Sequence, residues 1–332
     1  MESFIRKRFT TRILQEAINR FDGNAETATE LDGFENFLYE FQRNKKASIM
    51  RIAHSSRRSE ELIQGEIDWI NYLANQKINV VNAIPSINSK YVETIEDGHG
   101  QQFLAVCFCK ADGKPPWEYG WTDNEYRNFG RLIGKMHQVT KGYKPSDTSC
   151  KRPRWEDPII QDVEKNLLES EANIRDIYRQ YYTRACRLPK ENQAYGLIHF
   201  DANPSNLLID DHRVITLIDF DDCCYSWFIN DLAIILFYMV MGEEDVTGFI
   251  EHFMKHFLDG YRSEHKLDAK WLKEIPTFLK LREIDMYALI LRDFGADTDD
   301  PWCQRFLDGR KQRIEQDIPY VDYDFSKLVK YI

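Results

Sequence analysis

The chain has 332 residues, 43% hydrophobic and 30% charged, which is typical of a globular protein with enough apolar residues for two lobes or domains. Its 44 Lys and Arg against 54 Asp and Glu give a formal charge of −10, which argues against a nucleic-acid or anionic-membrane surface, since these need clustered Lys and Arg. The seven cysteines contain no Cys-x-x-Cys pair, and no signal-peptide core is recognisable. The longest apolar stretch, Leu232 to Met241, is too short to span a bilayer. We therefore expect a cytoplasmic protein with reduced thiols.

The first part of the chain carries strand patterns. Residues 1–21 predict one amphipathic helix, which is followed by the turn signals FDGN and LDGF. ENFLYEFQRNKKASIMRIA predicts two strands joined by the turn RNKK, and SEELIQGEIDWINYLANQ predicts a helix capped by Ser59. A second hairpin is expected within KYVETIEDGHGQQFLAVCFCK, and the Gly/Pro-rich stretch ADGKPPW that follows it indicates a domain boundary.

The rest of the chain is mainly helical. NEYRNFGRLIGKMHQVT predicts a helix, IIQDVEKNLLESEANIRDIYRQYYTRA predicts a single long one, and further helices run from INDLAIILFYMV to the end. Within these helical patterns only Pro276 is a helix breaker. We therefore expect an α+β protein with a small antiparallel-sheet N-lobe at residues 1–109 and a mainly helical C-lobe at residues 110–332.

The stretch LIHFDANPSNLLIDDHRVITLIDFDDC, residues 197–223, places acids and amides between apolar runs. Buried carboxylates are costly unless they are paired, protonated or bound to a cation, so the pattern indicates a polar site. Pro204 disfavours a continuous helix, which leaves Asp201 and Asn206 in a loop. NLLI and VITLIDF then predict a tight hairpin that turns at DDHR, with Asn206 before its first strand and Asp219 after its second.

The ends of an antiparallel hairpin meet on one side, so Asp201, Asn206 and Asp219 are expected to converge. An amide oxygen and a carboxylate oxygen, completed by phosphate oxygens, suit Mg²⁺ bound to a nucleotide. A second carboxylate that is not a ligand can accept a proton from an attacking hydroxyl. This reasoning assigns Asp201 as the catalytic base and Asn206 and Asp219 as metal ligands.

The pattern H-x-D-x-x-x-x-N at His199, Asp201 and Asn206, followed by Asp219 in LIDFDD, resembles the catalytic segment of the aminoglycoside phosphotransferase and choline kinase family, relatives of protein kinases. The resemblance implies a bilobal protein-kinase-like fold. It also implies ATP or GTP with Mg²⁺ as cofactors, and transfer of the γ-phosphoryl group to a hydroxyl of a small molecule. In the family the His braces the loop, so His199 is expected to support the loop rather than act as the base. Asp231 resembles the acid that holds the loop from below.

Further positions follow from the same resemblance. Arg51 in ASIMRIA stands where the family has a phosphate-anchoring Lys, and an Arg there can hold phosphate in a bidentate manner. Its expected partner on the next helix is Glu66, with Glu60 and Glu61 as surface alternatives.

Two other segments resemble nucleotide-binding parts of the family. In DGFENFLYEF, a G-x-G-x-x-G motif is absent, and Gly33, Phe34 and Asn36 are the candidates for contacting phosphates through backbone N–H groups. FLAVCFCKADG resembles the inter-lobe hinge that pairs with an adenine edge, which makes Phe108 and Cys109 nucleotide-binding candidates.

The acceptor pocket of the family is built by C-terminal helices, which here offer Arg282, Asp285 and Arg292, while Asp221 is a candidate second metal ligand or acceptor contact. Carboxylates suit an amino alcohol or an aminoglycoside, and an Arg suits the carboxylate of a homoserine-like amino acid, so the acceptor stays open. Two alternatives also remain: a protein Ser/Thr kinase of the same fold, and a catalytically inactive nucleotide-binding module in which Arg51 has replaced the Lys. The sequence does not predict the oligomeric state.

Overall fold

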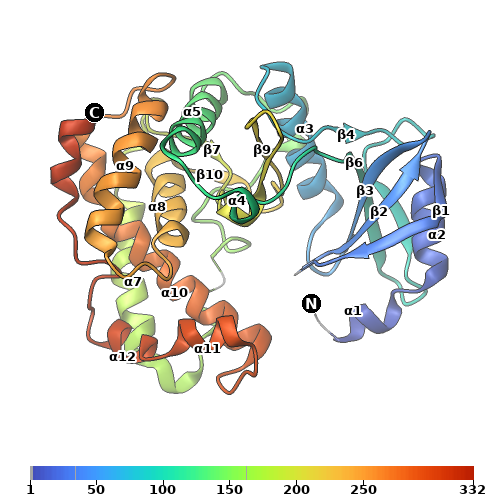
Figure 1. The fold of residues 1–332 in the computed structure, drawn as a ribbon. Coiled ribbons are helices and arrows are strands. Elements are labelled where there is room, and N and C mark those ends of the chain that lie inside the picture. Colours follow the sequence, from blue (N-terminus) through green and yellow to red (C-terminus); the bar gives the residue numbers. More distant parts are fainter. Residues whose placement is uncertain (1–2, 34, 162) are drawn as a thin grey trace. The chain divides into compact units, whose positions relative to one another are not determined.

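The computed structural model describes residues 3–33, 35–161 and 163–332, and the chain divides into two compact units (Figure 1). Unit 1 contains residues 1–114, 142–152 and 208–221. Unit 2 contains residues 115–141, 153–207 and 222–332. The chain thus enters unit 1 three times, which the sequence did not indicate.

Unit 1 is built on an antiparallel sheet. Its strands within the described residues are β1 (Gly23–Leu31), β2 (Phe37–Arg43), β3 (Lys46–His54), β4 (Ala83–Ile84), β5 (Glu93–Glu96) and β6 (Gln102–Cys109). They are ordered β1-β2-β3-β6-β4, and β5 also pairs with β6. Both predicted hairpins are confirmed. The β2–β3 turn places Asn44 and Lys45 at φ 49° and 62°, as a two-residue hairpin turn requires.

Strand β1 was not predicted, because its sequence GNAETATEL lacks the apolar alternation that signals a strand. It is an edge strand that is mostly exposed and pairs only with β2 among the strands of the sheet, so polar residues are tolerated along it. Gly23 begins it because a Cβ at this position would lie 2.2 Å from the Phe41 ring.

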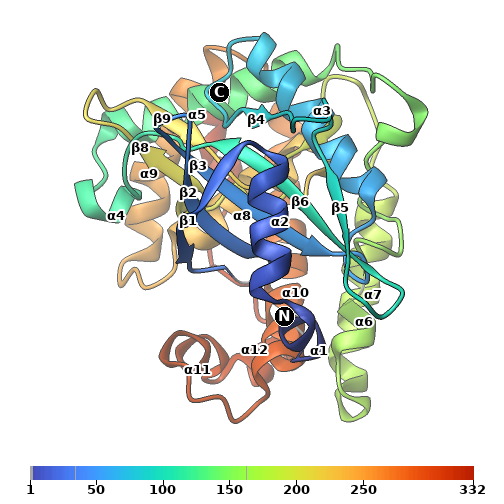
Figure 2. The same cartoon turned by 90° about the vertical axis from the view of Figure 1, so that its right-hand side faces the viewer.

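Helices α1 (Ser3–Arg8) and α2 (Thr11–Arg20) replace the single N-terminal helix that was predicted. The chain breaks between them because Thr10 adopts an extended conformation and its side chain caps α2 by accepting from the Ile13 N–H at 3.5 Å. Helix α2 lies across one face of the sheet (Figure 2), where Met50 and Ile52 of β3 belong to the same core cluster as residues of both helices. Alternation along β3 turns Arg51 to the opposite face.

Helix α3 (Glu60–Asn75) begins as predicted, with the Ser59 side chain accepting from the Leu62 N–H at 3.3 Å. The predicted hairpin that follows the candidate catalytic loop is also present, as β8 (Leu207–Ile209) and β9 (Ile215–Leu217). In unit 1, β9 bridges to Val80, and Phe220 packs edge-on against Trp69 of α3 with ring centroids 5.4 Å apart. These contacts fix the segment that carries Asp219 against α3.

Unit 2 is mainly helical. Its regular elements among the described residues are α4 (Pro116–Tyr119), α5 (Asp123–Thr140), α6 (Val163–Asn166), α7 (Ala172–Cys186), β7 (Tyr195–Ile198), β10 (Cys224–Trp227), α8 (Phe228–Met239), α9 (Val246–Arg262), α10 (Ile275–Phe294), α11 (Pro301–Leu307) and α12 (Arg310–Glu315). Pro276 does not break α10, because it lies in the first turn, where no intrahelical N–H donor is needed.

The single long helix predicted for residues 159–185 was wrong. In the described part of this segment, α6 is followed by a 3₁₀ turn at Glu169–Glu171 and then by α7. The Glu171 carboxylate folds back to accept from the Leu168 N–H at 3.1 Å and also accepts from the Tyr287 hydroxyl at 2.5 Å. A buried acid with these partners ends one helix and starts the next.

Helices α5 and α9 lie side by side in unit 2 with their backbones in direct contact. A Cβ at Gly130 of α5 would lie 1.9 Å from the Phe257 carbonyl oxygen, and a Cβ at Gly260 of α9 would lie 1.8 Å from the Arg127 carbonyl oxygen. Only glycine permits this approach. Within the described ranges, no helix combines the length and the apolar character needed to cross a membrane.

Candidate active site

The loop after β7 in unit 2 is held from beneath by Asp231, in the first turn of α8. Its Oδ1 accepts from the Phe200 N–H at 2.7 Å, and its Oδ2 accepts from the His199 N–H at 3.1 Å. His137 of α5 also contacts Oδ2 through Nε2 at 3.0 Å, while its Nδ1 meets the Tyr261 hydroxyl at 2.9 Å. Asp231 is fully buried, and these contacts compensate its desolvation.

This geometry fits the bracing role that the resemblance implied for Asp231, and it adds His137, to which the sequence assigned no role in the site. The signal for His137 was its place on the apolar face of a helix, which does not reveal a partner 94 residues away. His199 contributes from inside the loop, where its Nδ1 accepts from the Asp201 N–H at 3.2 Å. Phe200, between them, has φ 69°, a left-handed conformation that is unusual for an aromatic residue and that these contacts stabilise.

The Asp201 carboxylate is the centre of a hydrogen-bonded group. Its Oδ2 accepts from the side-chain amides of Asn206 at 2.9 Å and Asn203 at 3.0 Å, and its Oδ1 accepts from Arg282 Nη2 at 2.7 Å. Burial raises the pKa of Asp201 to about 6, against the lowering effect of Arg282 and the two amides, and the negative charge of Asp222 adds to the rise. The side chain keeps 23% of its surface exposed. Asp201 is therefore a reachable carboxylate that titrates just below neutral pH.

The orientation of Asn206 follows from its partners. Its Nδ2 lies 2.8 Å from the Asp201 carbonyl oxygen and 2.9 Å from the Asp201 carboxylate. Both partners are acceptors, so the amide nitrogen must face them and Oδ1 is turned away. An amide oxygen in this position fits the expected role of a ligand for a hard divalent cation.

Arg282 of α10 joins this group to the rest of the helix. Besides Asp201, its Nη2 donates to the Tyr238 hydroxyl at 2.7 Å, and its Nη1 donates to Asp285 Oδ2 at 2.9 Å. Tyr238 was missed, although it carries the one hydroxyl group in the apolar run LAIILFYMV. Arg292, the other candidate arginine on α10, instead pairs with Asp293 at 2.8 Å.

A narrow cavity of about 30 Å³ borders Arg282 and Asp285 in unit 2. Most of its other lining residues are aromatic or aliphatic and include Trp155, Phe200 and Phe278. A volume of this size holds roughly two water molecules, so the cavity is a side pocket next to the carboxylates and not room for a whole acceptor.

In unit 1, Arg51 of β3 and Glu66 of α3 form the predicted ion pair. Arg51 Nη1 and Nη2 donate to the two Glu66 oxygens at 2.8 and 2.5 Å, and both side chains are buried. Glu60, by contrast, accepts from Gln64. Burial alone would lower the pKa of Arg51, but the charges of Glu66, Asp221 and Asp219 raise it, so the guanidinium stays charged.

Asp219 ends the β8–β9 segment beside this pair, with Oδ1 at 3.7 Å from Arg51 Nη1. Its φ is 61°, and half of its side chain is exposed. A left-handed Asp costs some free energy and persists only where the surrounding structure holds it. Here the turn presents a carboxylate to solvent beside a charged guanidinium. Such an arrangement fits a group that binds a cation and phosphates together.

Asp221, two residues further on, is enclosed by arginines. Its Oδ2 accepts from Arg58 Nε at 3.1 Å, and its carbonyl oxygen accepts from Arg152 Nη2 at 2.6 Å. Burial would raise the pKa of Asp221, but Arg58, Arg51 and Arg152 outweigh it and lower the pKa to about 2. Sequence reasoning missed Arg58 and Arg152, because nothing local connects them to a carboxylate so distant in sequence. The expected acceptor or metal contact of Asp221 stays a prediction.

The nucleotide-binding roles expected for Gly33, Asn36, Phe108 and Cys109 stay predictions. A Cβ at Gly33 would lie 2.3 Å from the Asn36 carbonyl oxygen, so this turn requires glycine. Phe34 lies outside the described residues. The Arg51 guanidinium lies over the Phe108 ring at 5.3 Å, and the Cys109 N–H donates to the Asn82 carbonyl at 2.9 Å.

Comparison with known proteins gives three consistent findings. Residues 27–267 match the model of the phosphotransferase enzyme family. Amicoumacin kinase of Bacillus subtilis (strain 168) is 35% identical over 322 residues, which cover 96% of this chain and 96% of that protein. Homoserine kinase of Sinorhizobium medicae (strain WSM419) is 23% identical over 270 residues, 79% of this chain and 78% of that protein.

Among solved structures, amicoumacin kinase hAmiN in complex with AMP-PNP, Ca²⁺ and Ami superimposes with a TM-score of 0.93 at 33% sequence identity, covering 99% of this chain and 100% of that chain. The predicted α+β fold of protein-kinase-like type, with a strand-rich N-terminal region and a helical C-terminal region, is therefore confirmed.

Proposed function

Because the chain belongs to the phosphotransferase enzyme family, as its catalytic segment predicted, we propose that it is an ATP-dependent kinase of a small-molecule hydroxyl, with amicoumacin as the first candidate acceptor. The observation that carries this proposal is the Asp201 carboxylate, held by two amides and Arg282 and with its pKa raised to about 6. A group of this kind can take up a hydroxyl proton near neutral pH.

In the proposed reaction, Asp201 accepts the proton of the acceptor hydroxyl, and the hydroxyl oxygen forms the new bond to the γ-phosphorus. The bond from that phosphorus to the β–γ bridging oxygen breaks, which leaves ADP and a phosphomonoester. Asn206 and Asp219 would hold Mg²⁺, which would neutralise charge on the phosphates. Arg51, oriented by Glu66, positions the phosphates, and His199 and Asp231 keep the loop in place.

The charges around Arg282 support an acceptor that carries a cationic group. One guanidinium faces the carboxylates of Asp201 and Asp285, so the group is net negative once Asp201 is ionised. An acceptor whose only charge is a carboxylate would have to compete with two internal carboxylates for Arg282, whereas an ammonium group can approach them. This favours an acceptor with an ammonium group, such as an amino alcohol, over a purely anionic acceptor. The similarity to amicoumacin kinase over nearly the whole chain favours a small-molecule acceptor over a protein Ser or Thr.

The test is an ADP-release assay with Mg-ATP and a panel of amicoumacin, 1-amino-2-propanol and homoserine, followed by mass analysis of the products. We expect phosphorylated amicoumacin or amino alcohol, and a raised KM for the cationic acceptor in Asp285→Asn. Asp297→Asn makes the same charge change at an exposed position of the same unit and should leave KM unaltered. If no small molecule is phosphorylated while a protein Ser or Thr is, the proposal is wrong.

A further inference from the structure

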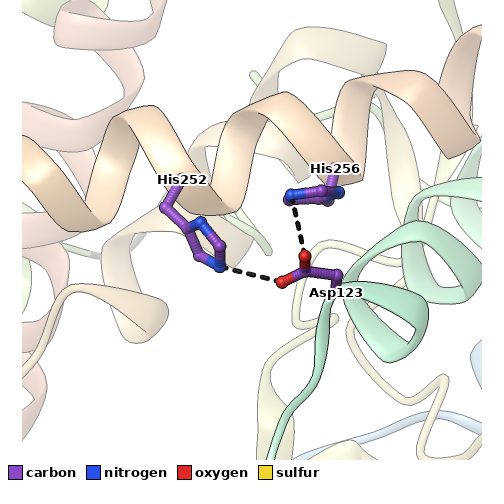
Figure 3. A group of neighbouring side chains, drawn as sticks. All are labelled: Asp123, His252 and His256. Atoms are coloured by element: carbon purple, nitrogen blue, oxygen red, sulfur yellow. Dashed lines mark ion pairs between the residues drawn. The ribbon is translucent and has the colours of Figure 1, made fainter.

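Unit 2 carries a second polar cluster that has no part in the chemistry proposed above. It consists of Asp123, the first residue of α5, and of His252 and His256 on α9 (Figure 3). The two His residues are four apart on one helix, which places both imidazoles on the same face, with ring centroids 5.1 Å apart. Figure 3 shows both rings turned towards the Asp123 carboxylate.

The donor atoms lie close enough together to converge on one metal ion. His252 Nε2 lies 3.0 Å from Asp123 Oδ1, and His256 Nε2 lies 3.3 Å from Asp123 Oδ2. One donor atom from each of the three residues can be chosen so that all lie within 4.8 Å of one another. Zinc binds His nitrogen and carboxylate oxygen at about 2.0–2.1 Å, so tetrahedral geometry separates two ligand atoms by about 3.3 Å.

The chemistry of the donors selects the metal. Two imidazole nitrogens and one carboxylate oxygen are ligands that Zn²⁺ and its borderline neighbours prefer, whereas Mg²⁺ and Ca²⁺ require oxygen donors. The three protein ligands leave a fourth position for water. The geometry points to a zinc site formed by Asp123, His252 and His256, which ties the start of α5 to α9.

The framework behind the cluster is rigid, which favours metal binding because less ordering is needed. Gly130 and Gly260 bring α5 and α9 into backbone contact, so the two helices supply donors at a fixed separation. Asp123 and His252 each keep 54% of their side-chain surface exposed, so an ion can enter from solvent.

Two cationic side chains lie near the cluster. Arg127 Nη2 lies 3.5 Å from His256 Nδ1, and the positive charge of Lys255, the preceding residue of α9, also acts electrostatically on His256. The charge of Arg127 is largely compensated by Asp259, which accepts from its Nε at 2.6 Å. Zinc at Nε2 leaves the imidazole proton on Nδ1, so the contact with Arg127 opens when zinc binds and the guanidinium stays with Asp259.

The experiment is a zinc titration of the full chain, stripped with chelator and kept free of nucleotide, by competition with a chromophoric zinc chelator. We expect one zinc per chain at this site, with affinity reduced by at least about tenfold in His252→Asn and in Asp123→Asn, since even outer-shell changes at zinc sites cost about 10–100-fold. His212→Asn, at an exposed histidine of unit 1, is the matched control and should bind zinc like the unmodified chain.

Two further readouts separate this site from cysteines and from the candidate active site. Zinc should raise the melting temperature of the unmodified chain but not that of the two variants, because binding to the native state stabilises it. Co²⁺ should give the intense visible bands of tetrahedral coordination without thiolate charge-transfer bands. Kinase activity measured with excess Mg²⁺ and a zinc-selective chelator should be equal in all four proteins. Equal zinc affinity in the unmodified chain and in both variants, or thiolate bands with Co²⁺, would overturn the proposal.

Discussion

Replacing Arg51 with Met tests whether the buried ion pair in unit 1 supports phosphate binding or only the fold. The guanidinium donates two hydrogen bonds to the Glu66 carboxylate at 2.8 and 2.5 Å, with almost no exposure of either side chain. Arg51→Met leaves the Glu66 charge buried without its partner. Removing one member of a buried pair costs about 3–5 kcal/mol of the free energy of unfolding.

The double variant Arg51→Met/Glu66→Met removes both charges, and substituting an apolar pair for a buried ion pair is nearly neutral, so most of that loss, about 3–5 kcal/mol, should be recovered. Activity should not recover, because the phosphate-positioning guanidinium is absent from both variants. We expect kcat/KM for ATP to fall by at least about 100-fold in both, comparable to the loss of one preorganised donor to a transition state.

Urea denaturation followed by fluorescence gives the free energies, and the ADP-release assay gives kcat/KM. Lys46→Met removes a cation from an exposed position of the same strand and is the control for both readouts. A folded double variant with near-normal kcat/KM would refute the assignment of Arg51 to phosphate binding, whatever the single variant does.

Three more changes probe the remaining parts of the site. Since the pKa of Asp201 is about 6 and the ionised form is the base, kcat/KM should fall roughly tenfold between pH 7 and pH 5. Arg282→Gln removes a cation that lowers this pKa, so it should move the acid limb of the pH profile to higher pH. Asp219→Asn should abolish Mg²⁺-dependent turnover but change the free energy of unfolding by less than about 0.5 kcal/mol, because the side chain is half exposed and Asn also tolerates the left-handed backbone. Retained turnover in this variant would reject Asp219 as a metal ligand. Asp231→Asn replaces an acceptor oxygen with a donor that faces backbone N–H groups, so the free energy of unfolding in urea should fall by about 1–3 kcal/mol and kcat should also fall. An unchanged kcat would show that Asp231 does not hold the catalytic loop.

What the sequence predicted correctly rested on local patterns. The two hairpins of the sheet, the Ser59 cap and the β8–β9 hairpin each follow from residues close together in the chain. The partner of Arg51 was also predicted, from the resemblance to the family, and Glu66 is the buried acid of α3 that forms the pair.

The failures have physical causes. Strand β1 is polar because it is an exposed edge, so its pattern carries no signal. The long helix of residues 159–185 is interrupted by a buried acid whose partner, Tyr287, lies 116 residues away. In the same way, Arg282 meets Asp201 across 81 residues, and one charged helix residue looks like another until the tertiary contact is known.

The role of Asp201 as the base is tested most directly by ³¹P NMR of the products formed from Mg-ATP and the candidate acceptors by the unmodified chain and by Asp201→Asn. We expect a phosphomonoester signal and ADP for the unmodified chain, and neither for the variant at equal protein concentration, although the variant should remain folded because Asn keeps the side-chain shape. A phosphomonoester formed at a comparable rate by Asp201→Asn would contradict the claim that this carboxylate is the base, and inorganic phosphate as the sole product of the unmodified chain would contradict the transfer to an acceptor hydroxyl.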